Sequence, residues 1–161
     1  MRVIELVFCN SDINLQIELS SEQLDLLHKL CEESNPYETG GIVIGRYSDN
    51  GVTAFIFEIT NSPDDSIREM TSFKRGINGL QKRLDKLWKD NLYYLGERHY
   101  HPNSLPIPSH SDIEQMISLS HNIKLNCPEP ILIIIGGGNN NWLLNAMVIV
   151  NDKIFYFDES R

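Results

Sequence analysis

Short apolar runs separated by turn residues dominate the pattern of hydrophobic and polar positions along the chain. The runs have the length of strands, and they predict eight strands, over residues 2–8, 15–19, 40–47, 52–60, 92–101, 130–135, 142–150 and 153–157. Asn50-Gly51 and Asn151-Asp152 are tight-turn sequences between consecutive runs. We therefore expect most of the strands to be joined as hairpins.

Three segments carry apolar residues at helical spacing and predict helices, over residues 20–34, 78–89 and 109–120. Asn35-Pro36 ends the first of these helices. Residues 61–76 lack a clear period, so we expect a loop there, which is either inert or acts as a lid or docking segment. Residues 136–141 combine glycines with asparagines and are expected to form a mobile hairpin tip.

Strands joined by hairpins, together with three helices, favour an α+β fold. We expect an α/β/α sandwich-like arrangement, in which a twisted, mostly antiparallel or mixed sheet has helices packed on it. The length of 161 residues favours a single domain over residues 1–161. Trp88, Trp142 and the apolar run 131–135 are expected to pack in its core.

The composition is that of a globular protein, with 41% hydrophobic and 22% charged residues, which excludes disorder, collagen and a coiled coil. No apolar run approaches the length of a bilayer span, and the start of the chain lacks the features of a signal peptide. The three cysteines, Cys9, Cys31 and Cys127, are widely spaced. These features predict a cytoplasmic protein with free thiols and no membrane partner.

The net charge of −8 argues against nucleic acid as a partner. The charge is uneven, because residues 68–98 hold eight basic residues against four acidic ones. This stretch is either a solvated helix face or a docking surface for an acidic partner.

The candidate chemistry lies in two short motifs. His99 and His101 are two residues apart near the end of a predicted strand, so both imidazoles point to the same side, as two ligands of a zinc site would. Ser109 and Asp112 open the next predicted helix, where the Asp112 carboxylate could bind the same metal. Each motif alone has a structural interpretation. A His-x-His pair is often a surface or core feature, and Ser-x-x-Asp is also a common helix N-terminus.

Taken together, His99-x-His101-x7-Ser109-x2-Asp112, with Glu38 upstream, resembles the JAMM motif of the JAB/MPN metallopeptidases, in particular their short bacterial branch. The similarity extends over residues 33–135 and includes the glycine-containing segment 38–45. The resemblance implies a cytidine-deaminase-like MPN/JAB fold and one Zn²⁺ per chain, held by His99, His101 and Asp112. It also implies that Glu38 moves protons between water and the leaving amine, and that the Ser109 hydroxyl stabilises the oxyanion.

The resemblance further implies a zinc-dependent isopeptidase or peptidase that cleaves after the C-terminal glycine of a ubiquitin-like protein or conjugate. The implied partners are that protein or its conjugated target, with E1-like and E2-like enzymes or a cyclic-nucleotide synthase, as in CBASS anti-phage defence. Two alternatives remain open, namely a non-catalytic MPN scaffold and a hydrolase of small amino-acid conjugates. The residues that contact the substrate are not identified by the sequence.

Two positions depart from the family pattern. Members of the family often have Trp before the first histidine and Ser or Thr between the two, where this chain has Arg98 and Tyr100. We expect both to alter the wall of the cleft or the choice of partner rather than the chemistry. His110, next to Ser109, is expected to be a surface residue and not a ligand.

Overall fold

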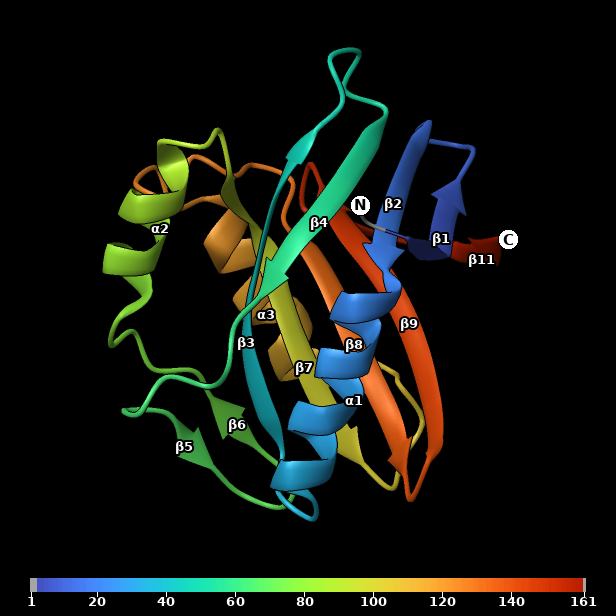
Figure 1. The fold of residues 1–161 in the computed structure, drawn as a ribbon, viewed down its shortest axis with the longest axis vertical. Helices are drawn as coiled ribbons and strands as arrows, with labels where there is room; N and C mark the ends of the chain where they lie inside the picture. Colours follow the sequence, from blue (N-terminus) through green and yellow to red (C-terminus); the bar gives the residue numbers. More distant parts are fainter. Residues whose placement is uncertain (1–2, 161) are drawn as a thin grey trace.

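The computed structural model of the protein describes residues 3–160, which form one large sheet, a small two-stranded ribbon and three helices (Figure 1). The strands of the large sheet are β1 (Ile4–Asn10), β2 (Leu15–Ser20), β3 (Thr39–Tyr47), β4 (Thr53–Ile59), β7 (Tyr93–Pro102), β8 (Ile131–Gly138), β9 (Asn141–Val150), β10 (Lys153–Tyr156) and β11 (Asp158–Ser160). The ribbon consists of β5 (Ile67–Arg68) and β6 (Phe73–Lys74), and the helices are α1 (Ser21–Ser34), α2 (Leu80–Trp88) and α3 (His110–Ser120).

The large sheet is mixed, with the strand order β10-β9-β8-β7-β3-β4-β2-β1-β11. Its neighbours are antiparallel except for β2 with β4 and β7 with β8. The last two strands of the chain lie at opposite edges of the sheet, although Phe157 alone separates them in sequence. Asn10 in β1 donates a hydrogen bond to the Tyr156 carbonyl in β10 at 2.8 Å. The sheet is therefore curled until its two edges nearly meet.

Helices cover both faces of the sheet, as expected for an α/β/α arrangement. α1 packs through Leu27 and Cys31 into the main core, which includes Ile133 of β8. α3 packs through Met116 on the other face, against alternate residues of the same strand such as Ile134. Because β8 is covered on both faces, it reads in sequence as a continuous apolar run. The mixed α+β fold expected from the sequence is confirmed.

Several boundaries differ from the expectations. The strand expected over residues 2–8 is Ile4–Asn10, and Arg2 lies outside the described residues. The expected loop 61–76 contains the ribbon β5–β6, and β11 was not expected. Residues 136–138 were expected in a turn but end β8. The turn is Asn139–Asn140, with left-handed φ values of 51° and 64°. Such a φ suits asparagine, which explains the asparagine-rich sequence there.

The expectation that Trp88 packs in the core is wrong, since it is 66% exposed. The apolar face of α2 is made by Leu80, Leu84 and Leu87, which pack against the sheet. Trp88 follows Leu87 by one residue and is therefore turned about 100° away around the helix axis. Trp142 packs against the core as expected, edge-on to the Tyr100 ring.

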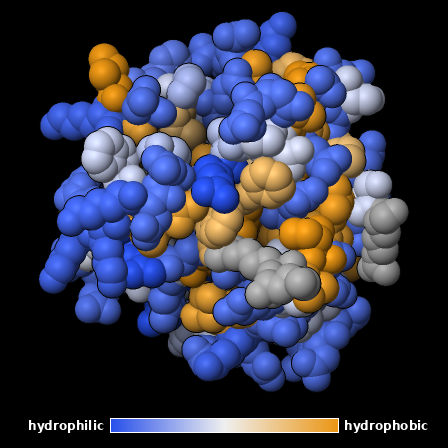
Figure 2. Space-filling view, turned by 45° about the horizontal axis from the view of Figure 1, so that its top comes forward, coloured by the Kyte–Doolittle hydropathy of each residue, from blue (hydrophilic) through white to orange (hydrophobic). Residues whose placement is uncertain are grey.

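The basic stretch 68–98 is less available than its sequence indicates. Arg75 pairs with Glu97, Arg83 pairs with Glu58, and Arg98 is fully buried. The exposed remainder includes the three lysines of the α2 region, Lys82, Lys86 and Lys89. Their exposure is that of a solvated helix face. On the face shown in Figure 2, hydrophobic residues lie among a mostly hydrophilic surface. Within residues 3–160, no helix is both long and apolar enough to cross a membrane.

Candidate metal centre

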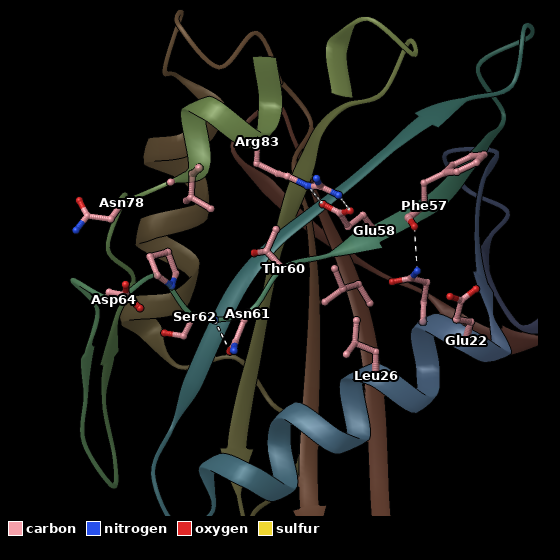
Figure 3. Close-up of a pocket in the computed structure, with 15 residues that line it drawn as sticks. Glu22, Leu26, Phe57, Glu58, Thr60, Asn61, Ser62, Asp64, Asn78 and Arg83 are labelled. Atoms are coloured by element: carbon pink, nitrogen blue, oxygen red, sulfur yellow. Dashed lines mark hydrogen bonds and ion pairs between the residues drawn. The ribbon is translucent and has the colours of Figure 1, made fainter. Parts of the chain in front are cut away.

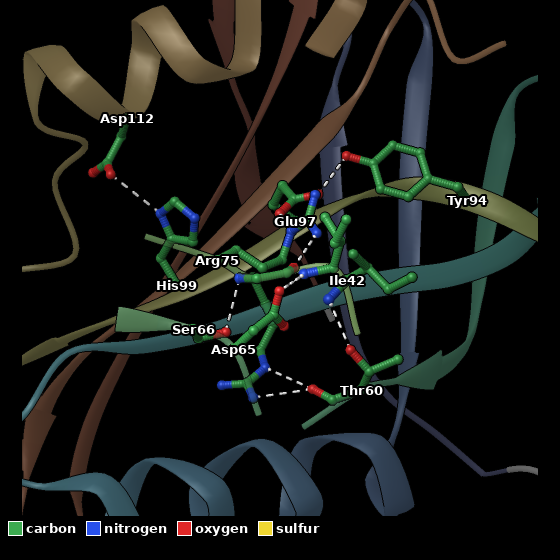
Figure 4. Close-up of polar contacts among 12 residues, drawn as sticks. Ile42, Thr60, Asp65, Ser66, Arg75, Tyr94, Glu97, His99 and Asp112 are labelled. Carbon is green, nitrogen blue, oxygen red and sulfur yellow. Dashed lines mark hydrogen bonds and ion pairs between the residues drawn. The ribbon is translucent and has the colours of Figure 1, made fainter. Parts of the chain in front are cut away.

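Two histidines and one aspartate converge where β7 ends and α3 begins. His99 and His101 alternate with Tyr100 along β7, so their imidazoles lie on the same face of the sheet. Asp112, in the first turn of α3, places Oδ1 3.2 Å from His99 Nδ1 and Oδ2 3.2 Å from His101 Nε2. The three side chains offer ligand atoms that all lie within 4.8 Å of one another. Figure 4 shows Asp112 reaching from its helix toward His99.

These residues fit a zinc ion in chemistry and in spacing. Two imidazole nitrogens and one carboxylate oxygen are ligands that zinc prefers, and three protein ligands leave a fourth position open. Tetrahedral bonds of about 2.0–2.1 Å would hold ligand atoms about 3.3 Å apart, and Asp112 approaches each histidine at 3.2 Å, through Oδ1 for His99 and through Oδ2 for His101. His99 is 4% exposed, and Asp112 is its only hydrogen-bond partner among the described residues. The buried Nε2 atom of His99 therefore has no hydrogen-bond partner within residues 3–160 and is available to bind a metal ion.

Glu38 approaches the histidines from a different part of the chain. It lies in the turn between α1 and β3, and its Oε1 atom is 3.7 Å from His101 Nε2. The pairing of Gly40 with His99 between β3 and β7 brings this turn to the end of β7. The Glu38 amide donates a hydrogen bond to the Glu69 carbonyl at 2.8 Å, which ties the turn to the ribbon. Glu38 thus faces the histidines without belonging to the group of three.

The environment shifts the pKa of Glu38, His101 and Asp112. Burial raises the pKa of Glu38, the nearby Asp112 carboxylate raises it further, and the two histidines partly oppose the rise. Burial lowers the pKa of His101, but hydrogen bonding to Asp112 and the charge of Glu38 raise it more, so that it lies above its usual value. Burial raises the pKa of Asp112, but hydrogen bonds from the two histidines outweigh this and hold it far below its usual range. Asp112 is therefore ionised and Glu38 is the carboxyl group that holds a proton more readily.

Ser109 is the N-cap of α3, and it forms a capping box with Asp112. The Ser109 Oγ accepts a hydrogen bond from the Asp112 amide at 3.0 Å, and Asp112 Oδ2 accepts one from the Ser109 amide at 2.8 Å. The structural interpretation of Ser-x-x-Asp is therefore correct. It does not compete with a role as a ligand, because the same Asp112 carboxylate also faces both histidines.

The ribbon β5–β6 forms a wall beside the histidines. The Phe73 ring meets the His99 ring edge-on, with centroids 6.0 Å apart. Gly40 permits this packing, because a Cβ there would lie 2.6 Å from the Phe73 ring. After β6, Arg75 donates a hydrogen bond at 2.5 Å to Glu97, which is fully buried in β7 (Figure 4). This buried ion pair anchors the end of the ribbon to β7.

Sequence reasoning missed Phe73, Arg75 and Glu97 as parts of this site. One signal was present, because Glu97 is an acidic residue inside the expected strand 92–101. A buried carboxylate needs a cationic partner, but nothing local identifies Arg75 as that partner.

The expectation that Arg98 and Tyr100 alter the cleft wall is wrong, because both are 0% exposed. Alternation along β7 sends them to the face opposite His99 and His101. Arg98 donates from Nε at 3.2 Å and from Nη2 at 3.0 Å to the Thr60 carbonyl. His110 is exposed, as expected, and pairs with Glu114 at 3.0 Å.

Two hollows of the surface lie away from this group. One, of about 680 Å³, lies between α1, the end of β4 and the start of α2 and includes Glu22, Asn61 and Arg83 (Figure 3). The other, of about 710 Å³, lies beside Trp88. Neither is lined by Glu38, His99, His101, Ser109 or Asp112. The candidate metal centre therefore lies outside both hollows.

Similar proteins were found in sequence. Residues 20–150 match the family model for prokaryotic homologs of the JAB domain. A CD-NTase/cGAS isopeptidase of Enterobacter hormaechei is 39% identical over 137 residues, which cover 85% of this chain and 76% of that protein. A protein of the same name from Escherichia coli is 30% identical over 146 residues, 89% of each chain. A probable metalloprotease of Sinorhizobium fredii is 30% identical over 115 residues, which cover 69% of this chain and 70% of the relative.

The fold also resembles a solved structure. The solution structure of a protein from Desulfitobacterium hafniense superposes with a TM-score of 0.63 at 18% sequence identity, covering 84% of this chain and 86% of the other. At this identity the likeness concerns the fold alone.

Proposed function

This chain belongs to the family of prokaryotic homologs of the JAB domain, and on that premise we propose that it is a zinc-dependent isopeptidase. The observation that carries the proposal is the convergence of His99, His101 and Asp112 within 4.8 Å, with the Glu38 carboxylate 3.7 Å from His101. Three ligands and an acid–base group beside an open coordination position are the parts that metal-assisted hydrolysis requires.

His99, His101 and Asp112 would hold the ion. When bound, zinc supplies Lewis-acid chemistry that polarises the scissile carbonyl and makes a water molecule more acidic. The nearby backbone of Ile107 also helps to raise the pKa of His101.

Glu38 would act as the general base and then as the general acid. It takes a proton from the attacking water and later delivers that proton to the leaving amine. A carboxyl group with a raised pKa is suited to both steps, because it accepts a proton more readily than an ordinary carboxylate does. Its position beside the ligands, but outside the ligand set, leaves it available for proton transfer.

Ser109 would stabilise the negative oxygen that forms on the substrate carbonyl. Its Oγ accepts a hydrogen bond from the Asp112 amide, and its own hydroxyl proton remains available for donation. A preorganised donor of this kind is typically worth about a hundredfold or more in rate.

The substrate proposal comes from the relatives. Two of them bear the name CD-NTase/cGAS isopeptidase, and we extend that activity to this chain. The bond cleaved would be the amide that joins the C-terminal glycine of a ubiquitin-like protein to a CD-NTase or another target, in a system that includes E1-like and E2-like enzymes. A C-terminal tail of small residues could lie in an extended form close to the metal centre, because glycine has no side chain to hold it away.

The test is cleavage of a CD-NTase conjugate by the purified protein, with a linear fusion and a small glycine conjugate as parallel substrates. We expect cleavage of the protein conjugate, abolished by a chelator and by Glu38→Gln or His101→Ala. His110→Ala removes an exposed imidazole close to the site and serves as the matched control, with activity unchanged.

Elemental analysis of zinc completes the test. We expect about one zinc per chain in the parent protein and in Glu38→Gln, and none in His101→Ala. Absence of zinc from the parent protein would favour a non-catalytic scaffold. Cleavage of the small conjugate alone would favour a hydrolase of amino-acid conjugates.

A further inference from the structure

The turn that carries Glu38 is a tightly bonded unit. Within it, the Tyr37 amide donates to the Ser34 carbonyl at 2.8 Å, and the Ser34 hydroxyl donates to the Tyr37 carbonyl at 2.8 Å. The Asn35 amide donates to the Cys31 carbonyl at 3.0 Å and so joins the turn to the last turn of α1. These bonds couple Asn35 and Tyr37 to the end of α1, so a contact that fixes Asn35 also restrains the residue that precedes Glu38.

One side-chain contact ties this unit to the strand that carries the histidines. Asn35 Nδ2 donates to the Tyr100 hydroxyl at 2.7 Å, and Tyr100 lies between His99 and His101 in sequence. The same nitrogen lies 3.5 Å from Asn103 Oδ1, just after β7. This hydrogen bond therefore joins the turn to β7 at the residue that lies next to both histidines in sequence.

Tyr100 itself is held at both ends. Its backbone pairs with Thr39 of β3 and Ile135 of β8, and its hydroxyl donates to the Gly137 carbonyl at 2.9 Å. The ring is 0% exposed and lies edge-on to Trp142, with centroids 5.9 Å apart. A side chain fixed in this way can transmit the position of β7 to the Glu38 turn.

The amide of Asn35 also has little room to move. A Cβ at Gly138 would lie 2.9 Å from Asn35 Nδ2 and 2.8 Å from Asn103 Oδ1. The glycine therefore admits both side chains at this point of close approach. The hydrogen bond to Tyr100 and the close approach to Gly138 together restrict the position of the Asn35 amide.

We infer that Tyr100 and Asn35 are positioning residues, which hold the 34–38 turn so that the Glu38 carboxylate stays beside His101. Neither residue touches the group of three ligands across the sheet, and Tyr100 faces away from it. The inference rests on the proposed function for its catalytic consequence. A displacement of about 1 Å in a catalytic group can cost up to about a hundredfold in rate, so a fixed turn has a direct kinetic effect.

The first test is amide hydrogen exchange in the metal-free protein, which does not depend on activity. Tyr100→Phe keeps the ring and removes only the hydroxyl. We expect the Tyr37 and Glu38 amides to exchange about tenfold faster, while amides of β4, with which the Tyr100 hydroxyl has no hydrogen bond, stay unchanged. Tyr94→Phe removes another buried hydroxyl near the other end of β7, and it should leave the exchange of the turn amides unchanged. Equal exchange in the two variants would overturn the inference.

The second test separates positioning of Glu38 from support of the ligands. In the zinc-loaded protein, Tyr100→Phe should lower kcat about tenfold and leave KM and zinc affinity within about twofold. A loss of zinc affinity in step with kcat would overturn the inference, because the network would then act on the ligands. Asn35→Ala removes the same hydrogen bond from a half-buried position and decides the question if Tyr100→Phe does not fold. If the protein cleaves no conjugate, the exchange measurement still decides this inference by itself.

Discussion

Asp112 combines two tasks in one carboxylate. One oxygen faces His99, and the other faces His101 while also accepting the Ser109 amide at the start of α3. The helix end thereby fixes the carboxylate before any ion binds, so the ligand loses little conformational freedom on binding. The sequence could predict this arrangement, because the motif Ser-x-x-Asp places both residues on one helical turn.

Glu38 differs at the same scale, because its place beside the histidines was expected only from the family resemblance and not from its local sequence. Local sequence shows only an acid before two glycines. Burial and the nearby Asp112 carboxylate raise the pKa of Glu38. Asp112 and the residues that bury Glu38 belong to strands and helices far away in the chain.

The raised pKa of Glu38 leads to a prediction on stability. The folded protein binds this proton more tightly than the unfolded chain does, so the ionised carboxylate destabilises the fold. The cost is absent below the usual pKa of 4.5 and grows as the pH rises through the folded-state value. In metal-free protein, Glu38→Gln should therefore raise the melting temperature by a few degrees at pH 8, and this gain should vanish near pH 4.

Thermal unfolding at both pH values measures this effect. Glu33→Gln makes the same change at an exposed position of α1 and should show no gain at pH 8. A Glu38→Gln protein that is no more stable than its parent at pH 8 would contradict the prediction.

At the scale of elements, β7 separates two kinds of residue by alternation. His99 and His101 lie on the face of the candidate metal centre, whereas Arg98 and Tyr100 are buried on the opposite face. The period of two was visible in the sequence. The family pattern suggested that Arg98 and Tyr100 line the cleft. Alternation along the strand instead turns both side chains to the face opposite the histidines.

The ribbon β5–β6 lies at the limit of sequence analysis. Each of its strands has two residues, which is too short for a periodic pattern to be recognised. The ribbon is held by contacts with other elements, namely Phe73 with His99 and Arg75 with Glu97. Its existence therefore depends on tertiary packing.

The start of α3 allows the two roles of Ser109 to be separated. Ser109→Ala removes the cap and the hydroxyl, and it should cost about 1 kcal/mol of stability. Ser109→Gly also lacks the hydroxyl, but glycine is a tolerated N-cap, so it should cost only a few tenths of a kcal/mol. If the hydroxyl stabilises the oxyanion, both variants should lose about a hundredfold in kcat.

Urea unfolding and steady-state kinetics on the two variants provide the measurement. Activity that follows the stability ranking, with Ser109→Gly close to the parent protein, would show that Ser109 acts only as a cap.

At the scale of the whole molecule, the order of strands assembles the site. β3 and β7 are neighbours in the sheet although β4, the ribbon and α2 lie between them in sequence. The Glu38 turn at the start of β3 consequently lies beside the end of β7, and the crossover through α3 returns Asp112 to the same place. The site is therefore made from three separate segments of one sheet and its covering helix.

Because the three ligands come from β7 and α3, zinc should stabilise the whole fold. An ion that binds only the folded state adds about 2.7 kcal/mol when its free concentration is 100 times the dissociation constant. We expect the metal-free protein to melt at a higher temperature when zinc is added, with His110→Ala responding as the parent does. His101→Ala should show little response, and an equal response there would place the ion elsewhere.

The sequence by itself determined the types of most elements and the spacing of the candidate ligands. These are local properties, since the period of apolar residues and the facing of His99 and His101 depend on the geometry of one strand or one helix. Only the tertiary structure decided that Glu38 lies beside His101, that Arg75 pairs with Glu97, and that Tyr100 accepts a hydrogen bond from Asn35 in the 34–38 turn. Such contacts follow from the pairing of β3 with β7, and that pairing is selected by the packing of the entire sheet rather than by any short segment.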